Sequence, residues 1–399
     1  MIYFNTGSMA ANDGAYWSAG QVFVALESCV IGVRDAWRHM PYEYRDPSLN
    51  ALFEDMGRLV TGESVDRDSI EARLLEVAEA NAPELAEYWR HLGRGVGIPD
   101  TAFKARAPYL FPEEPPVRSF ATSGTTGSSR GRAPYSKRGL ALMDLSIHHN
   151  ARRHIIGSLE APAIVRLVPS ERAAPEMVMA YGMERISADF GDPELSASVV
   201  TPGGVDLAAL RALLDRAERE TRPVVLIGGS FAFVNICERL ESQGLRWSLA
   251  PGSRAVDAGG FKGRSRAVDV AELRALIARS FGIAPAACVN LFGMTELASQ
   301  LYDARDVAVG PLGERPKARL PFVYPRVRDA HTLELRTAGV GLLEVVDCAV
   351  LDRPCAVLTG DVGHATNDGV AITGRVLRGT SRGCSLTLDA ITSREAAHV

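Results

Sequence analysis

Short apolar segments alternate with amphipathic ones through the middle of the chain, and this alternation limits the folds that the chain can adopt. The apolar segments are rich in Val, Ile and Leu and too short for buried helices, which favours strands. We expect strands at 164–168, 223–227, 247–250 and 288–291, and helices at 205–221, 231–243 and from a capping box of Asp269 and Glu272. Strands that alternate with helices predict an α/β fold whose mixed, largely parallel sheets are flanked by helices.

The two ends of the chain differ from its middle in composition and in the spacing of apolar residues. Apolar residues recur at helical spacing in 51–59, and 68–92 is rich in Ala, Leu and Glu, so the N-terminal region is expected to be mostly helical. The proline-rich segment 108–116 cannot continue a helix and marks a boundary. From residue 332 the sequence becomes rich in glycine and strand-forming residues, which predicts a small β-rich module. The predicted parts are a helical region at 1–106, an α/β core at 107–330, and a β-rich module with a short tail at 331–399.

The composition excludes several classes of protein. Asp and Glu (48) slightly outnumber Lys and Arg (44) among the 399 residues, so a basic domain that holds nucleic acid is not expected. The longest apolar stretches are shorter than the ~20 residues that span a bilayer, and the N-terminus lacks a basic region followed by an apolar one. Six cysteines without Cys-x-x-Cys spacing argue against structural zinc and a disulfide framework. We therefore expect a cytoplasmic protein without a membrane span.

The segment 123–131, Ser-Gly-Thr-Thr-Gly-Ser-Ser-Arg-Gly, has the composition of an anion-binding loop. Gly124 and Gly127 let the backbone bring N–H groups close to a phosphate, and the hydroxyl side chains can donate hydrogen bonds to it. Arg130 adds a positively charged guanidinium group that can bind a phosphate. A helix expected from about Ser136 presents the positive end of its dipole. The motif is not a Walker A loop, because Gly-Lys-[Ser/Thr] is missing. A flexible surface loop is the alternative.

A second polar motif follows the predicted strand at 288–291. A glycine turn leads from Phe292 to Thr295 and Glu296. Ligands of open α/β sheets bind at the carboxyl ends of strands, where a carboxylate can hold Mg²⁺ between phosphate oxygens and an aromatic ring can lie against a base. The alternative is an ordinary strand-to-helix junction with Glu296 in the first helical turn.

Two further motifs lie near the C-terminus. Leu-Thr-Gly-Asp ends at Asp361, whose carboxylate on a tight turn can accept both hydroxyls of a ribose, and Arg375 could reach the same sugar. An ordinary hairpin turn is the alternative. In Ser-Arg-Gly-Cys-Ser, the neighbouring glycine leaves the thiol of Cys384 accessible, and Arg382 favours its thiolate. An inert, buried cysteine is the alternative there.

In this order, the four motifs resemble those of the adenylate-forming superfamily, which includes acyl-CoA synthetases, luciferases and the adenylation domains of peptide synthetases. Within it, the chain is most similar to the LuxE-type acyl-protein synthetases, because of Gly-Gly-Phe-Lys at 259–262, the ending around Cys384 and the length. The resemblance implies the superfamily's large N-terminal domain. Most of the mobile C-terminal domain is expected to be lacking, since few residues follow Arg375.

The resemblance also implies an activity. The enzyme would use ATP to activate a carboxylic acid as acyl-AMP, releasing pyrophosphate, with Thr295 on the α-phosphate and Mg²⁺ on Glu296. The acyl group would then pass to Cys384 and on to a partner protein such as a reductase. No lysine follows Lys317, so Lys262, Arg378 or Arg382 would replace the late catalytic lysine of the superfamily. The implied nucleotide-binding residues are Ser123, Gly124, Thr125, Thr126, Gly127, Arg130, Gly228, Gly229, Phe292, Asp361 and Arg375.

Two other interpretations stay open. The acyl-AMP could be handed to coenzyme A, an amine or another small nucleophile, with Cys384 structural. The chain could also be a nucleotide-binding homologue without turnover. The sequence leaves open whether the acid is aliphatic, aromatic or amino-substituted, and it does not fix the oligomeric state. Thioester formation with and without coenzyme A separates the first two activities, and pyrophosphate exchange separates both from the third.

Overall fold

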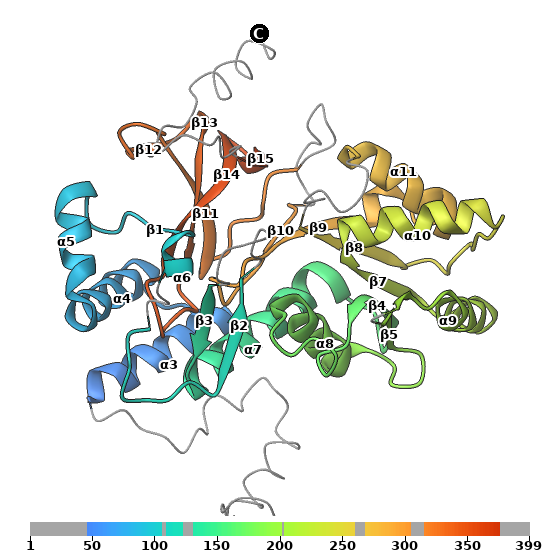
Figure 1. Ribbon diagram of the computed structural model, residues 1–399, viewed down its shortest axis with the longest axis horizontal. Helices are drawn as coiled ribbons and strands as arrows, with labels where there is room; N and C mark the ends of the chain where they lie inside the picture. The colour runs from blue at the N-terminus through green and yellow to red at the C-terminus, as the bar shows by residue number, and fades with distance from the viewer. Residues whose placement is uncertain are drawn as a thin grey trace, which may run out of the picture.

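A computed structural model describes residues 46–105, 109–122, 131–201, 203–259, 268–304 and 315–375. Sheets of seven, six and two strands organise these residues (Figure 1). The largest sheet has the order β10-β9-β8-β7-β4-β5-β6, in which β9 to β5 are parallel and the two outer strands are antiparallel. Its strands are β4 Ala163–Pro169, β5 Ala197–Thr201, β6 Gly204–Val205, β7 Val224–Gly229, β8 Arg254–Ala258, β9 Cys288–Phe292 and β10 Leu301–Tyr302.

Helices cover both faces of this sheet, as the alternating pattern predicts. Ile164 and Val225 belong to the core beneath α7 and α8, whereas Val165 and Leu226 belong to the core beneath α9, α10 and α11. Figure 1 shows α10 and α11 on one side of β7 and β8, and α8 on the other. The helices are α7 Lys137–Ala151, α8 Val178–Phe190, α9 Leu207–Arg219, α10 Ser230–Ser242 and α11 Val270–Phe281. A turn of π-helix, Arg152–Ile156, continues α7, and a 3₁₀ turn, Pro285–Ala287, precedes β9.

The β-rich C-terminal part forms an antiparallel sheet, which also includes the strands β1 and β11 from before residue 331. Its order is β1-β14-β13-β11-β12, with β15 beside β14, and β1 runs parallel to β14. The strands are β1 Ile98–Pro99, β11 Val323–Arg328, β12 Leu335–Arg336, β13 Gly339–Asp347, β14 Ala356–Thr366 and β15 Gly369–Arg375. The two-stranded sheet is the hairpin of β2 Arg118–Ala121 and β3 Arg132–Tyr135. The predicted division into three parts at 106 and 330 stays a prediction.

The N-terminal region is mostly helical where it is described, and the helical stretch expected at 68–92 is confirmed, divided into two helices. The chain forms two helices there, because Pro83 has no N–H to continue a helix and Ala82 leaves the helical conformation (φ −140°, ψ 85°). The helices of this region are α3 Pro47–Thr61, α4 Arg67–Asn81, α5 Pro83–Leu92 and the short α6 Ala102–Ala105.

One correction concerns the strand expected at 247–250, which forms no strand. The strand is β8, a few residues later, and its sequence Arg-Ala-Val-Asp-Ala breaks the apolar pattern. Asp257 can nevertheless be buried, because Ser230 Oγ and Asn290 Nδ2 each donate a hydrogen bond of 2.8 Å to its Oδ2. The capping box before α11 is confirmed at its N-cap, where the Asp269 side chain accepts from the Glu272 N–H at 2.6 Å.

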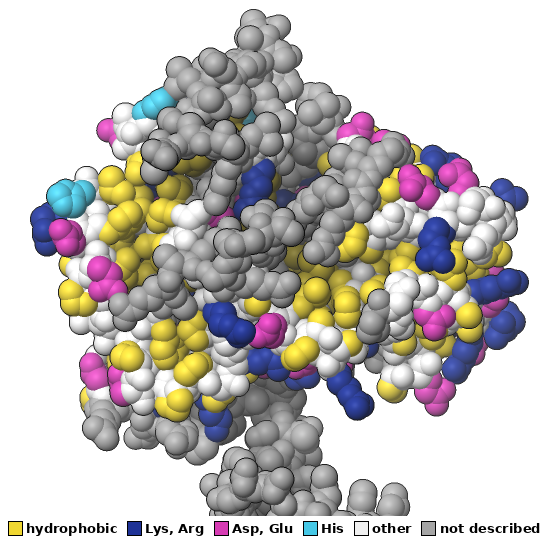
Figure 2. Space-filling view, in the orientation of Figure 1, with side chains coloured by type: hydrophobic (Ala, Val, Ile, Leu, Met, Phe, Trp, Pro, Cys, Tyr) yellow, Lys and Arg dark blue, Asp and Glu magenta, His cyan; other side chains and the backbone are white. Residues whose placement is uncertain are grey.

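Charges of both signs mix on the surface. In Figure 2, Lys and Arg side chains are interspersed with Asp and Glu over α9 to α11, where Arg211–Asp215, Arg216–Glu220 and Arg279–Glu241 form exposed ion pairs. In the part of the chain that the structure describes, every helix is too short or too polar to cross a bilayer.

A buried carboxylate ties the N-terminal region to the antiparallel sheet. Glu344, in the middle of β13, is fully buried. It accepts hydrogen bonds from Arg328 Nε at 2.6 Å, from Arg326 Nε at 2.8 Å and from the backbone N–H of Gly97 at 2.6 Å. One side chain therefore compensates two guanidinium groups and holds the segment that leads into β1.

We expect Glu344→Gln to lower the free energy of unfolding by about 3 kcal/mol, because it leaves the buried guanidinium of Arg328 without a counter-charge and leaves Arg326 with Glu71 alone. Glu241→Gln, which removes the exposed partner of Arg279, should change it by less than about 0.5 kcal/mol. Urea titrations of both variants measure the difference. Equally small changes in the free energy of unfolding for both variants would show that Glu344 does not stabilise the contact between the N-terminal region and the antiparallel sheet.

Candidate active site

The hydroxyl-rich loop is closed at its base. Residues 123–130 lie outside the described residues, and with them Ser123, Gly124, Thr125, Thr126, Gly127 and Arg130. The flanking strands β2 and β3 pair up to Ala121 and Arg132, and the Thr122 N–H donates to the Gly131 carbonyl at 2.8 Å. Gly131 packs so tightly that a Cβ there would lie 2.5 Å from the carbonyl oxygen of Phe103. The loop thus leaves and re-enters the fold at one fixed point.

The Thr-Glu motif lies beside that point. Thr295 and Glu296 form a turn between β9 and β10, so the alternative that placed Glu296 in a first helical turn is wrong. Both residues are buried, and Thr295 Oγ1 donates to the carbonyl of Ala121 at 3.4 Å. The second motif therefore contacts the end of β2, two residues before the first motif begins.

Arg353 fixes this junction, and sequence reasoning missed it. Arg353 belongs to the connection from β13 to β14 and is buried; its Nε donates to the Glu296 carbonyl at 2.7 Å and its guanidinium hydrogen-bonds the Tyr135 hydroxyl. The Tyr135 hydroxyl donates in turn to the Leu297 carbonyl at 2.8 Å. Asp347 accepts from the next N–H groups, those of Ala298 and Ser299, at 2.9 and 2.7 Å. No motif surrounds Arg353 in the sequence, so only the fold could reveal its role.

The third motif forms the pair that the sequence suggested, but not on a turn. Asp361 lies in the middle of β14, so the expectation of a tight turn is wrong: the segment continues a long strand that pairs with β13 and β15. Arg375 is the cross-strand partner of Asp361 on β15, with Nε 3.8 Å from Oδ1. Asp100, which follows β1, was missed; its Oδ2 lies 3.2 Å from the same guanidinium. Two carboxylates therefore hold Arg375.

The remaining predicted residues lie at the carboxyl ends of adjacent parallel strands. Gly228 and Gly229 end β7, and Phe292 ends β9. A Cβ at Gly228 would lie 2.5 Å from Leu167 Cβ, so the close approach of β4 requires glycine there. Lys262 and Cys384 fall outside the described residues.

A buried polar network joins these strand ends. Asp257 on β8 binds Asn290 on β9, and Lys317 Nζ donates to Asn290 Oδ1 at 2.6 Å and to Asp303 Oδ1 at 2.9 Å. Burial raises the pKa of Asp257, while the hydrogen bonds from Asn290 and Ser230 oppose that shift. Lys317 is committed to this network and holds β9 where it enters the Thr-Glu turn.

An apolar cavity of about 80 Å³ adjoins the same turn. It lies between α7, α8 and the ends of β8 and β9, and it includes Gly293 and Met294, the residues between Phe292 and Thr295. The other lining residues are Met143, Ile147, Val178, Met179, Gly182, Met183, Ile186, Ala258, Gly259, Leu291, Leu297, Gln300 and Tyr302.

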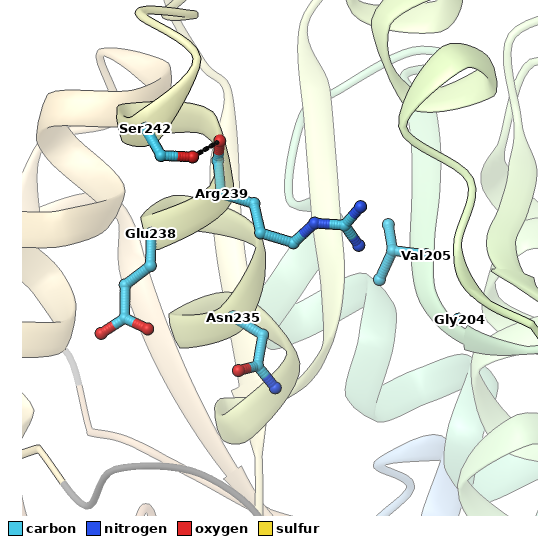
Figure 3. A pocket seen from close by; sticks show the side chains of 6 residues that line it. All are labelled: Gly204, Val205, Asn235, Glu238, Arg239 and Ser242. Atoms are coloured by element: carbon cyan, nitrogen blue, oxygen red, sulfur yellow. Dashed lines mark hydrogen bonds between the residues drawn. The ribbon is translucent and has the colours of Figure 1, made fainter.

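A larger and more open depression of about 400 Å³ lies elsewhere. Figure 3 shows that it lies between α10 and β6, with the Arg239 side chain extended toward Val205. It contains none of the predicted site residues. Its α10 residues run from Asn235 to Ser242, the last residue of that helix, which leads away from the carboxyl end of β7. The depression therefore does not belong to the site.

The described cysteines are poor nucleophiles. Cys237, Cys288, Cys348 and Cys355 are buried. Burial raises the pKa of Cys237 to about 11 and the pKa values of Cys288 and Cys355 to about 12, and it raises the pKa of Cys348 as well. Among the described residues, no group of three or more His, Cys, Asp or Glu side chains gathers to hold a metal ion.

Comparison with known proteins gives the fold. Neither a family model nor a curated protein sequence matches the chain. A 2-hydroxyisobutyryl-CoA ligase, solved in complex with 2-HIB-AMP and CoA, is similar with a TM-score of 0.56 and 14% identity, over 79% of this chain and 76% of that one. The same ligase in its thioesterification state gives 0.55 and 14%, over 82% and 69%. ATP-bound MatB from Rhodopseudomonas palustris gives 0.45 and 21%, over 64% and 47%.

At these identities the similarity establishes the fold alone. The chain has the mixed α/β fold of adenylate-forming enzymes, and the fold class expected from the motifs is confirmed. The narrower resemblance to LuxE-type synthetases stays a prediction.

A titratable group follows the cavity-lining Met143 in α7 but does not itself line the cavity. There, Asp144 accepts a hydrogen bond of 2.6 Å from the Tyr181 hydroxyl of α8. Burial raises the pKa of Asp144 to about 6, against the opposing effect of this hydrogen bond. The folded state thus binds the Asp144 proton more tightly than the unfolded state, and this carboxyl destabilises the fold increasingly as the pH rises from about 4 to about 6.

We expect Asp144→Asn to remove this pH dependence. The quantity to compare is the free energy of unfolding of the variant minus that of the unmodified protein. This difference should be about 2–3 kcal/mol larger at pH 8 than at pH 4. Chemical denaturation at both pH values measures it, with Glu160→Gln, a change at an exposed acid, as the control. The same difference at both pH values would contradict the raised pKa.

Proposed function

We propose that this protein activates a carboxylic acid with ATP, forming an acyl-AMP and releasing pyrophosphate. The observation that carries the proposal is that one short segment, 292–296, borders two different environments. On one side, Thr295 bonds the base of the hydroxyl-rich loop. On the other side, Gly293 and Met294 line an apolar cavity. A carboxylate at this border has its apolar chain in the cavity and its charge beside the phosphates.

The chemistry requires positioning rather than a base. A carboxylate is already ionised at pH 7, and one of its oxygens attacks the α-phosphorus. The bond from that phosphorus to the bridging oxygen breaks, and its electron pair leaves with pyrophosphate. The enzyme has to hold two anions together and neutralise their charge, which is the usual demand of phosphoryl and nucleotidyl transfer.

Each motif has a part in that task. The loop, with Ser123, Thr125, Thr126 and Arg130 between Gly124 and Gly127, would bind the β- and γ-phosphates, and Thr295 the α-phosphate. Asp361, with Arg375, would hold the ribose. Phe292 would stack on adenine, beside Gly228 and Gly229.

Glu296 is the residue that would hold Mg²⁺. Carboxylate oxygens suit this ion, which in nucleotide sites commonly takes one or two protein carboxylates and completes its shell from phosphates and water. A single buried acid next to the loop therefore fits it. When bound, Mg²⁺ would supply positive charge to the phosphate oxygens.

A similar solved structure supports activation of an acid. The 2-hydroxyisobutyryl-CoA ligase was solved with 2-HIB-AMP and CoA. Because that ligase shares the fold, a site for an acyl-AMP at the corresponding strand ends is the simplest function for this protein.

For the second step we infer that the acyl group passes to Cys384 and then to a partner protein such as a reductase. The buried, poorly ionised thiols of the described cysteines support this choice, since a thiolate is the effective nucleophile. Lys262 would take the part of the late catalytic lysine. Transfer to coenzyme A, which the similar ligase binds, is the competing second step.

Glu296→Gln should reduce ATP–pyrophosphate exchange at least tenfold at limiting Mg²⁺, because the amide is a weaker ligand for the ion. Part of the loss should be restored by raising the Mg²⁺ concentration. Glu160→Gln should exchange at the original rate at every concentration. An unchanged rate in Glu296→Gln would remove this residue from the site.

Cys384→Ser should still make acyl-AMP but should no longer retain the acyl group as a thioester. Intact-protein mass spectrometry after incubation with acid and ATP distinguishes the states, with Cys29→Ser as the matched control. Thioester on another cysteine at the original rate would refute the role of Cys384. A small-molecule thioester that appears only with coenzyme A would favour the competing acceptor.

A further inference from the structure

A strand from the N-terminal region reaches the predicted ribose site. β1 runs parallel to β14, with Pro99 opposite Leu358, and the N–H of Asp100 donates to the Leu358 carbonyl at 3.0 Å. Strand pairing thus continues for one residue beyond the end of β1. The same short segment of β14, residues 358–361, also carries Asp361. The N-terminal region therefore places Asp100 at the part of β14 that is proposed to hold the ribose.

Asp100 and Asp361 share one guanidinium group unequally. Arg375 Nη2 donates to Asp100 Oδ2 at 3.2 Å, whereas Arg375 Nε lies 3.8 Å from Asp361 Oδ1, which is beyond hydrogen-bond distance. A Cβ added at Gly360 would lie 3.7 Å from Arg375 Nε and 3.8 Å from Asp100 Oδ2. The ion pair of Asp100 and Arg375 therefore lies against the backbone that leads into Asp361.

Exposure to solvent divides the roles of these side chains. The Asp100 side chain is 9% exposed, and that of Arg375 is 51% exposed. A carboxylate as buried as that of Asp100 needs a counter-charge, and Arg375 supplies it. Half of the Arg375 side chain is accessible to a ligand, whereas little of the Asp100 side chain is. Asp100 is thus placed to act on a ligand through Arg375 rather than by contact.

The ion pair also orients the guanidinium group. This group is planar, and its Nε and Nη2 nitrogens share one edge. In Arg375 that edge faces the two carboxylates, so Nη1 lies on the other side of the group. A ribose bound here would donate a hydroxyl hydrogen to Asp361 and accept a hydrogen bond from the guanidinium of Arg375.

Without the charge of Asp100, the attraction between Arg375 and Asp361 would be unopposed. The guanidinium would move from 3.8 Å into hydrogen-bond distance of Asp361 and compete with the ribose hydroxyls for its oxygens. Resting on the function proposed above, we propose that Asp100 is a positioning residue for the nucleotide. It holds Arg375 in the orientation in which Arg375 and Asp361 bind the ribose hydroxyls together.

The test is the affinity for ATP and for 2′,3′-dideoxy-ATP, measured by calorimetry with Mg²⁺ and without an acid. The unmodified protein should bind ATP at least tenfold more tightly than the dideoxy nucleotide, which lacks both ribose hydroxyls. Asp100→Asn should weaken ATP binding at least fivefold and binding of the dideoxy nucleotide less than twofold. Asp368→Asn, a change at an exposed acid in the turn between β14 and β15, should leave both affinities within twofold.

A second variant tests whether Asp100 acts through Arg375. Arg375→Gln should lower the preference for ATP over the dideoxy nucleotide at least fivefold. Adding Asp100→Asn to it should change the ATP affinity less than twofold, because the group that Asp100 positions is already gone. Arg375→Gln alone leaves the buried carboxylate of Asp100 without this counter-charge, so the double variant should have the higher Tm of the two.

The outcomes separate this inference from the function on which it rests. The positioning role would be overturned by equal weakening of both nucleotides in Asp100→Asn, by an ATP preference that this variant retains or the unmodified protein lacks, or by independent effects of Asp100→Asn and Arg375→Gln. Each of these results would leave ATP-dependent activation in place. A folded, unmodified protein that binds neither nucleotide would overturn both.

Discussion

The buried guanidinium of Arg353 is the contact on which the arrangement of the site depends. It reaches from the connection between β13 and β14 to the Glu296 carbonyl and to the Tyr135 hydroxyl, so one side chain joins parts of all three sheets. Asp347, at the end of β13, binds the N–H groups that follow Glu296. The backbone of the Thr-Glu turn is thus held from the antiparallel sheet. The site is therefore a junction between sheets rather than a feature of one of them.

This junction separates two tasks. In the proposed reaction, the polar side, with the loop base, Thr295 and Glu296, would hold the triphosphate and its metal ion. The apolar side, walled by α7 and α8, would hold the chain of the acid. The buried network of Asp257, Asn290 and Lys317 keeps the strand ends between them rigid, which is the condition for effective positioning of two anions.

The sequence predicts the local features of this structure well and the long-range ones poorly. Apolar runs identify β4, β7 and β9, and a capping residue locates α11, because these signals lie within a few residues of one another. The strand β8 was missed because its buried Asp257 needs partners from β9 and α10, which a local pattern cannot show. Arg353 and Asp100 were missed for the same reason: each gains its role from residues that only folding brings close. The prediction that Asp361 and Arg375 lie together held even though the expected turn was a strand, since strand register pairs them.

A crystal structure with a non-hydrolysable ATP analogue and Mg²⁺ tests the central claim most directly. Our account predicts that the ribose hydroxyls bind Asp361 and that the triphosphate lies between Thr295 and the loop at 123–130, with the metal ion on Glu296. A nucleotide bound in the depression between α10 and β6, or anywhere else away from the Thr-Glu turn, would contradict it.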